Sequence, residues 1–346
     1  MVSKHTMMRL FSAAANASRI TSLAERRYGG AGTIFMLHSI VSDQDFLPRE
    51  NIHTSAGFLD AMIRHYLRHR IPIVSLSEAM ERLKSRSRHR FVCFTFDDGY
   101  RDNLTLALPI FRKHGVPFSV YVSNAFLDRN YPEYWWGQLR HLVMDHDIVA
   151  VDSLPKPLAT STAREKIAAY HTLRKLMDSG RMAEAERNDL FSRYGISVVE
   201  ALDRDSMTAA ELKAAAEAEP LLEIGGHTLS HNRLAQLDEV TAYDEICRNK
   251  AAIEALIDRP LRHFAYPYGD ADSCGERDFE LVRKAGYDTA TTTRLGNLFP
   301  AHLESRWSLP RMRFIGPCES VPFMEAQRSG AFTAAVSGFG NPVVTL

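Results

Sequence analysis

The sequence predicts an α/β fold: an irregular (β/α) barrel of about seven parallel strands that carries a helical insertion. Two observations support this prediction. Short apolar runs typical of buried strands alternate with helix-like segments along most of the 346 residues, and such alternation favours parallel strands joined by right-handed crossovers. Residues 91–96 are apolar at nearly every position, as expected for a strand that is covered on both faces.

The expected elements divide the chain into three parts. Residues 1–30 form an N-terminal helical extension that ends at the glycine-rich stretch 29–32, because glycines interrupt a helix. Residues 31–320 form the barrel, and residues 321–346 form a C-terminal tail. Within the barrel, residues from about 150 to 218 are rich in Ala, Glu, Lys and Arg and show little strand pattern, so we expect a helical insert there.

The strands and helices of the barrel follow in order. We expect strands at residues 33–37, 71–74, 91–96, 117–122, 221–225, 262–266, 289–293 and 308–312. We expect helices at residues 54–66, 78–84, 103–114, 134–144 and 239–257, and another around 281–282. In such barrels the active site forms at the carboxyl ends of the strands. That rule directs attention to the polar residues that follow or close expected strands: His38, Asp97, Asp98, His227 and residues 266–268.

Composition and charge exclude several classes of protein. Lys plus Arg and Asp plus Glu each number 42, so the formal net charge is zero and no basic excess indicates a nucleic-acid partner. No apolar run reaches the roughly 20 residues that cross a bilayer. The four cysteines, at 93, 247, 274 and 318, form no CxxC pair, which favours a reducing compartment. We therefore expect a cytoplasmic protein. Secretion is the alternative, because residues 10–17 combine a short apolar stretch with a small-x-small pattern.

Two adjacent carboxylates end the expected strand at 91–96, in the segment TFDDG at residues 95–99. Carboxylates at the end of a buried strand are costly unless each has a partner. A turn at Gly99 can bring Asp97 and Asp98 into one pocket, where one binds a cation and the other acts as a base. The alternative interpretation is a turn stabilised by hydrogen bonds of the aspartates themselves.

Two histidines four positions apart lie in the segment HTLSH at residues 227–231. On a helical turn this spacing places both imidazoles on one face, where they can hold one metal ion. The alternative is an exposed pair at a helix start, capped by Thr228 or Ser230.

A third segment, HFAYPYG, occupies residues 263–269. By itself it is typical of a strand that ends in a Pro-Gly turn. It is also consistent with an aromatic wall for sugar rings that offers a backbone N–H to an oxyanion.

These three segments, in this order, resemble the motifs of the polysaccharide deacetylases of carbohydrate esterase family 4. The resemblance is carried by TFDDG, HTxxH and YPYG, and it spans residues 33–312. The ordered set is specific, whereas each segment alone is not. The resemblance implies the nodulation-protein-B homology domain, which is an irregular (β/α) barrel, and hydrolysis of N-acetyl groups.

The resemblance also implies a role for individual residues. Asp98, His227 and His231 would hold a divalent metal, usually zinc, and Asp97 would be the general base. Two imidazoles and one carboxylate leave positions for water and substrate, as in a catalytic rather than a structural zinc site. The substrate and its oxyanion would be bound at Pro267 and Tyr268, with the backbone N–H of Tyr268 as donor.

The sequence departs from the family pattern at two positions, which leaves the base-orienting arginine and the general acid to be identified. Many members carry an Arg before the Pro of the third segment to orient the base, but that place holds Ala265 here, so we expect Arg311 to replace it. Many members also have a late Leu-x-His whose His is the general acid, and we find no convincing match. We therefore expect His38 to be the acid, since a His at this position is thought to protonate the amine in the branch acting on poly-N-acetylglucosamine. The alternative is a structural His.

The sequence therefore favours a metal-dependent hydrolase of amide bonds. Its expected substrate is an N-acetylated glycan, either an N-acetylglucosamine-containing polysaccharide or a chitooligosaccharide. Two alternatives stay open: a metal-dependent O-acetyl esterase on the same scaffold, and a non-catalytic glycan-binding protein. The complete set of Asp97, Asp98, His227 and His231 speaks against the second alternative.

Overall fold

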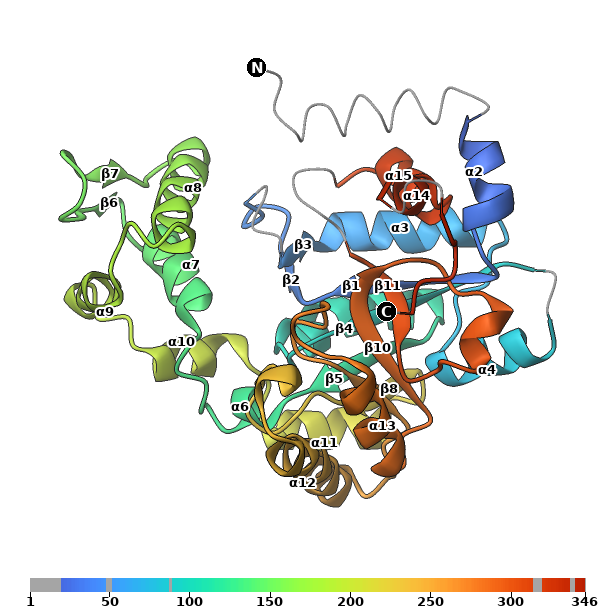
Figure 1. The fold of residues 1–346 in the computed structure, drawn as a ribbon. Helices are drawn as coiled ribbons and strands as arrows, with labels where there is room; N and C mark the ends of the chain where they lie inside the picture. The colour runs from blue at the N-terminus through green and yellow to red at the C-terminus, as the bar shows by residue number, and fades with distance from the viewer. Residues whose placement is uncertain (1–19, 48–51, 87–88, 314–318, 337–339, 346) are drawn as a thin grey trace. The chain divides into compact units, whose positions relative to one another are not determined.

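In the computed structural model, seven parallel strands close into a barrel, as the sequence predicts (Figure 1). The order around the barrel is β1-β11-β10-β9-β8-β5-β4, and β1 pairs with both β4 and β11 to complete the ring. The structure describes residues 20–47, 52–86, 89–313, 319–336 and 340–345. The barrel strands are β1 (Gly32–Leu37), β4 (Phe91–Phe96), β5 (Phe118–Val122), β8 (Leu222–Gly226), β9 (His263–Ala265), β10 (Thr289–Leu295) and β11 (Leu309–Arg313).

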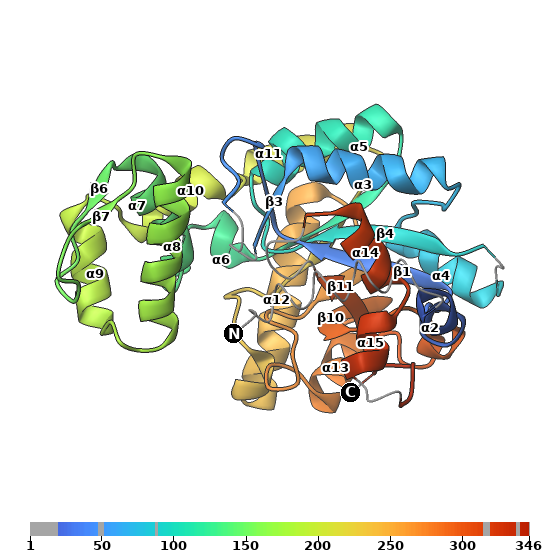
Figure 2. The same ribbon diagram turned by 90° about the horizontal axis from the view of Figure 1, so that it is seen from above.

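Helices surround the strands of the barrel (Figure 2). Because successive side chains of a strand point to opposite faces, Phe35 and Phe94 face outward and share one hydrophobic core with these helices. Their neighbours Ile34 and Cys93 face inward and belong to a second hydrophobic cluster. The surrounding helices include α3 (Ala56–Arg68), α5 (Leu108–His114), α11 (Ala209–Ala218), α12 (Glu239–Ile257) and α13 (Glu276–Lys284).

Helix α4 (Leu76–Lys84) closes the barrel at the amino ends of its strands. Its residues Leu76 and Met80 belong to the inward-facing cluster. The carboxylate of Glu223, at the start of β8, accepts a hydrogen bond from the backbone N–H of Leu76 at 2.8 Å. The opposite end of the barrel, where the strands finish, is therefore the end at which a site can open.

Two expectations about the early part of the chain need correction. Residues 71–74 were expected to form a strand, but they form a single bridge between Ile73 and Val92. Val92 exchanges hydrogen bonds with Pro72 and Val74, and α4 begins two residues after Val74, so no longer ladder with β4 forms. The structure also contains a short parallel pair after β1 that the sequence did not predict, β2 (Ser39–Val41) and β3 (His53–Ser55).

Residues Asp128–Ser206 form a second compact unit, separate from the unit that contains the barrel. The sequence predicted a helical insert over about 150–218, so the unit begins and ends earlier than that range. The reason is that α7 packs on α8 and α10, whereas α11 packs on β8 and α12. The unit holds α7 (Trp135–Asp145), α8 (Ala163–Asp178), α9 (Glu184–Arg193), α10 (Val198–Asp205) and the hairpin of β6 (Ile148–Val149) and β7 (Leu158–Ala159).

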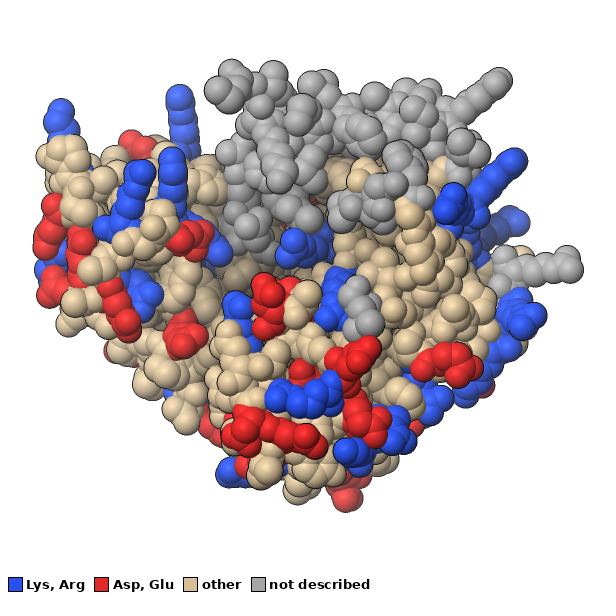
Figure 3. Space-filling model, in the orientation of Figure 1, with Lys and Arg blue, Asp and Glu red and all other residues tan. Residues whose placement is uncertain are grey.

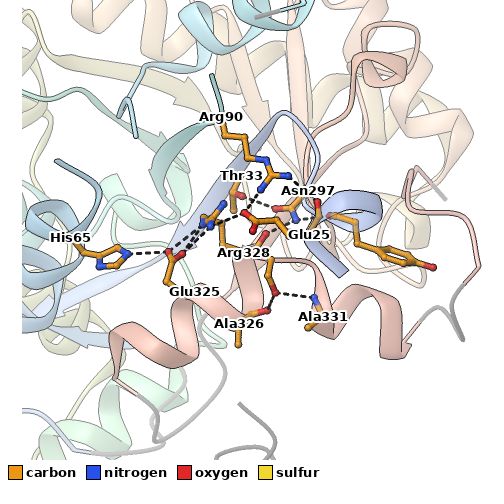
Figure 4. A network of polar contacts seen from close by, with 11 residues as sticks. Glu25, Thr33, His65, Arg90, Asn297, Glu325, Ala326, Arg328 and Ala331 are labelled. Carbon is orange, nitrogen blue, oxygen red and sulfur yellow. Dashed lines mark hydrogen bonds and ion pairs between the residues drawn. The ribbon is translucent and has the colours of Figure 1, made fainter. Parts of the chain in front are cut away.

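The last described helices join the helix at Ile20–Tyr28 through a polar network centred on the buried Arg328 (Figure 4). Nη2 of Arg328 donates to Glu25 at 3.0 Å and to Glu325 at 2.9 Å, and Arg90 also donates to Glu25. Nδ2 of Asn297 donates to the carbonyl of Arg328 at 2.9 Å. The network ties α14 to the barrel beside β1. The helices concerned are α2 (Ile20–Tyr28), α14 (Val321–Arg328) and α15 (Ala331–Val336).

The N-terminal extension, the cysteines and the absence of a membrane-spanning segment were also predicted from the sequence. Most of the expected N-terminal extension, residues 1–19, and Cys318 lie outside them. Cys93, Cys247 and Cys274 are free thiols. Among the helices that the structure describes, none combines the length and apolarity that a membrane-spanning segment needs.

Candidate active site

Three side chains from two separate segments meet at the carboxyl ends of the strands. Nε2 of His231 lies 3.1 Å, and Nε2 of His227 lies 3.3 Å, from the same atom, Oδ1 of Asp98. One potential ligand atom from each residue lies within 4.8 Å of the other two. In the described part of the chain, this is the one group of three His, Cys, Asp or Glu residues arranged to hold a metal ion.

The charges of this buried group suit a cation. Burial raises the pKa of the Asp98 carboxyl, but hydrogen bonds from His227 and His231 outweigh burial and hold that pKa well below its usual range. Burial lowers the pKa of the His231 imidazole. Nδ1 of His227 donates to the carbonyl oxygen of Ala265 at 2.8 Å, so Nε2 is the nitrogen whose lone pair a bound metal would take in place of the proton that it shares with Asp98. An ionised carboxylate and neutral imidazoles are the donors of a catalytic zinc site.

The segment that carries both histidines is a loop, so the predicted helical turn is wrong. Two side chains of α12 hold the loop. Oδ1 of Asn249 accepts from the backbone N–H of His227 at 3.0 Å, and Oε2 of Glu245 accepts from the N–H of the residue before His231 at 2.7 Å. These bonds replace those of a helix. The imidazoles converge because α12 shapes the loop, not because of helical spacing.

Strained backbone gathers at the site. Asp98, Thr228, His231 and Tyr268 have φ angles of 78°, 60°, 57° and 62°, and they are four of the eight non-glycine residues with positive φ among those described. Each such conformation costs on the order of 1 kcal/mol. Surrounding contacts must impose them, which is typical of functional sites.

Asp97 lies buried beside these residues and is held by Arg311 of β11. Nη1 and Nη2 of Arg311 donate to the two oxygens of Asp97 at 2.6 and 2.7 Å. Burial raises the pKa of the Asp97 carboxyl, but the charge and hydrogen bonds of Arg311 outweigh burial and lower that pKa. Nε2 of His38 lies 4.0 Å from Oδ2 of Asp97, with 23% of the His38 side chain exposed. The structure thus brings all three expected catalytic residues together.

Two polar residues that sequence reasoning did not assign to the site fix the chain after His38. The oxygens of Asp102 accept hydrogen bonds from Oγ of Ser39 at 2.5 Å and from the N–H of Ile40 at 2.8 Å. Nδ2 of Asn103 donates to the carbonyl of His38 at 2.7 Å. In the sequence these two residues stand out only as a polar pair shortly after TFDDG. Their hydrogen-bond partners, at 38–40, lie more than 60 residues away.

Of the aromatic residues in the third segment, 263–269, Tyr268 contacts the site. The ring of Tyr268 packs against that of His231 with 5.3 Å between centroids. Its turn is fixed by two hydrogen bonds, from the N–H of Gly269 to the carbonyl of Pro267 and from Thr293 to the carbonyl of Tyr268. Tyr266 instead belongs to the hydrophobic core. The expected aromatic wall is therefore reduced to Tyr268.

Comparison with known families gives one match. The model of the family described as polysaccharide deacetylase matches residues 84–174 and 183–290, which together make up more than half of the chain. The matched ranges contain Asp97, Asp98, His227, His231 and Tyr268, whereas Arg311 lies beyond them. No curated protein matches the chain.

Several solved structures share the fold. IcaB from Ammonifex degensii is 18% identical with a TM-score of 0.55, over 87% of this chain and 98% of that chain. The Streptococcus pyogenes deacetylase PplD in complex with acetate is 15% identical with a TM-score of 0.52, over 82% of this chain and 92% of that chain. A de-N-acetylase from Aggregatibacter actinomycetemcomitans is 13% identical with a TM-score of 0.51, over 82% and 95%. At these identities the likeness concerns the fold.

Proposed function

The chain belongs to the polysaccharide deacetylase family, and from that premise we propose that it is a metal-dependent hydrolase of N-acetyl groups. The proposed substrate is an N-acetylglucosamine-containing polysaccharide or a chitooligosaccharide. Asp98, His227 and His231 would hold one divalent metal, with zinc as the expected ion. Pro267 and Tyr268 would bind the substrate next to it.

One observation carries this proposal. Oδ1 of Asp98 meets two imidazole nitrogens in a buried group, and a second carboxylate, Asp97, lies beside it with its own arginine. A metal site needs ligands of this kind, and amide hydrolysis needs a separate base next to them. The residues that would meet both requirements come from three segments that are far apart in the sequence, at 97–98, 227–231 and 311.

The residues of this site account for each proton in the reaction. When bound, a divalent metal supplies Lewis acidity, which polarises the acetamide carbonyl and acidifies water. Asp97 accepts a proton from the water that attacks the carbonyl carbon, while Arg311 keeps its carboxylate ionised and oriented. His38 donates a proton to the nitrogen as the carbon–nitrogen bond breaks, so acetic acid and a free amine form. The acid loses its proton to solvent and leaves as acetate, and the proton on Asp97 returns to His38. The N–H of Tyr268 donates to the carbonyl oxygen as negative charge develops there.

Acetate release tests the proposal. The purified protein is incubated with chitooligosaccharides, peptidoglycan fragments and O-acetylated xylan, with added Zn²⁺ or with a chelator. We expect release from at least one N-acetylated glycan, loss of that release with chelator, and its recovery when excess metal is restored.

Other outcomes point to other functions. Release from O-acetylated xylan alone would show an O-acetyl esterase and contradict the proposed amide hydrolysis. Binding of glycans without release from any of them, with metal present, would identify a non-catalytic glycan-binding protein.

A further inference from the structure

Arg233 lies at the edge of the site, and none of the roles proposed above uses it. Its Cζ lies 4.1 Å from the centroid of the Tyr268 ring. That ring packs in turn on His231, with 5.3 Å between the ring centroids. One aromatic ring therefore separates the guanidinium from the proposed metal ligands, a span that a substituent or neighbouring unit of a bound glycan can cover.

The guanidinium of Arg233 has hydrogen-bond donors that no described residue accepts from. The residue is half-buried, yet within the described residues its side chain makes the ring contact with Tyr268 and no hydrogen bond or ion pair. Stacking fixes the plane of the group and leaves its five N–H donors available. A fixed and partly desolvated guanidinium is suited to binding a carboxylate or phosphate with two parallel hydrogen bonds.

Arg313 adds a second positive charge at the same end of the barrel. It is the last residue of β11 and follows the buried Arg311 by two positions, so strand alternation places both on the inward-facing side. Met312, between them, belongs to the outer core. Arg313 is exposed and pairs in register with Met36 of β1, two residues before His38.

We infer that the substrate glycan carries an anionic group, a carboxylate or a phosphate, close to the acetamide that is hydrolysed, and that Arg233 binds this group. The inference rests on the proposed function, since it places the anion next to the proposed metal site. The chain has no net charge, and acidic and basic side chains are interspersed on the face drawn in Figure 3. Recognition of an acidic glycan therefore depends on local guanidinium groups.

The test compares glycans that differ in charge alone. A hyaluronan tetrasaccharide, which carries carboxylates beside N-acetylglucosamine, is compared with its methyl ester, and chitotetraose is compared with its 6-phosphorylated form. For the wild type we expect kcat/KM to be about tenfold higher for the charged member of at least one pair, the size of one hydrogen-bonded charge. In Arg233→Gln this ratio should fall toward one, and Arg233→Lys should restore part of it.

Arg26 supplies a matched control, because it is an exposed arginine on α2, which precedes the amino end of β1. Arg26→Gln should keep the wild-type ratio. A wild-type ratio near one in both pairs, or an unchanged ratio in Arg233→Gln, would overturn the inference. Equal losses for charged and neutral glycans in Arg233→Gln would also overturn it, because they would show that Arg233 supports Tyr268 and nothing more.

Calorimetry separates this inference from the proposed function. Binding of each glycan pair is measured with the Asp97→Asn variant, which is not expected to turn substrate over. Tighter binding of the charged glycan supports the inference even when the wild type releases no acetate from any of them. Equal binding of charged and uncharged glycans contradicts the inference even when acetate release is normal.

Discussion

At the scale of single residues, the site depends on buried charges that each have a dedicated partner. Arg311 is fully buried and donates to both oxygens of Asp97 and to the carbonyl of Thr292. We propose that Arg311 orients Asp97 in place of the arginine that the family pattern leads us to expect at Ala265. The side chain that orients the proposed base therefore comes from a different strand and reaches the same carboxylate.

Replacing Arg311 tests this arrangement. In Arg311→Met the carboxylate of Asp97 loses its partner and its orientation, so we expect kcat to fall about 100-fold, a typical contribution of a positioned base. Metal content should stay at the wild-type level, because no metal ligand changes. Steady-state acetate release and metal analysis provide the two measurements.

Arg311→Lys is the control for misfolding. It keeps the buried positive charge but cannot donate to both oxygens of Asp97. It should fall between the wild type and Arg311→Met. Wild-type kcat in Arg311→Met would show that Asp97 does not need this arginine.

Sequence reasoning could select some of these residues and not others. Asp97, Asp98, His227 and His231 lie in short segments whose spacing is informative. Arg311 could be proposed because the expected arginine was missing. The residues that shape the histidine loop are Asn249 and Glu245 on α12, and no local pattern connects them with it. The one hint in the sequence was that these two polar residues occupy positions on the apolar side of that helix, where a buried partner would be expected.

At the scale of elements, α4 is fixed to the barrel by a half-buried carboxylate. Glu223 accepts hydrogen bonds from the backbone N–H groups of Leu76 and Ser77 and from Oγ of Ser119. Burial raises the pKa of the Glu223 carboxyl, but His263 and these hydrogen bonds outweigh burial and lower that pKa to about 2. The carboxylate thus stabilises the start of α4, where the helix dipole favours negative charge.

This pKa predicts how stability depends on pH. A carboxyl whose pKa is 4.5 when unfolded and about 2 when folded stabilises the protein by about 3 kcal/mol above pH 4.5, and this contribution is lost as pH falls toward 2. The free energy of unfolding, measured with urea, should therefore differ most between wild type and Glu223→Gln above pH 4.5. The difference should shrink at lower pH.

Glu217→Gln, on the exposed side of α11, is the matched control and should show no such pH dependence. A constant difference between wild type and Glu223→Gln from pH 6 to pH 3 would contradict the assignment of charge to Glu223.

Helices and strands were predicted well where the local sequence pattern determines their ends. They were predicted poorly where tertiary contacts determine the backbone conformation. The strand at 91–96 and the helix at 239–257 were correct to the residue, because apolar runs and capping residues define their ends. The strand expected at 71–74 was wrong, since only Pro72 and Val74 bond to Val92 before α4 begins at Leu76. The predicted helical turn at 227–231 was wrong because α12 imposes a loop.

At the scale of the whole molecule, the barrel is closed by elements from both ends of the described chain. β1 pairs with β11 and β4, and Arg328 of α14 joins Glu25 of α2. The fold class could be predicted because strand and helix patterns alternate regularly. The particular strand pairs that close the ring could not be read from local patterns, because β1 and β11 lie far apart in the sequence.

Removing the guanidinium of Arg328 tests the role of this closure. Arg328→Met leaves the half-buried Glu25 and Glu325 with fewer partners, so we expect a loss of about 2 kcal/mol in the free energy of unfolding, less than for a fully buried pair. Arg283→Met is the matched control, because Arg283 forms an exposed pair with Glu280 on α13. Urea denaturation at neutral pH compares the two, and equal midpoints for both variants would contradict a structural role for the network.

Metal content measured beside activity tests the central claim most directly. We predict that the wild type and Asp97→Asn each bind one zinc ion per chain, that Asp98→Ala binds none, and that of the three the wild type alone releases acetate. A full complement of metal in Asp98→Ala would contradict the account, because the ion would then be held somewhere other than between Asp98, His227 and His231.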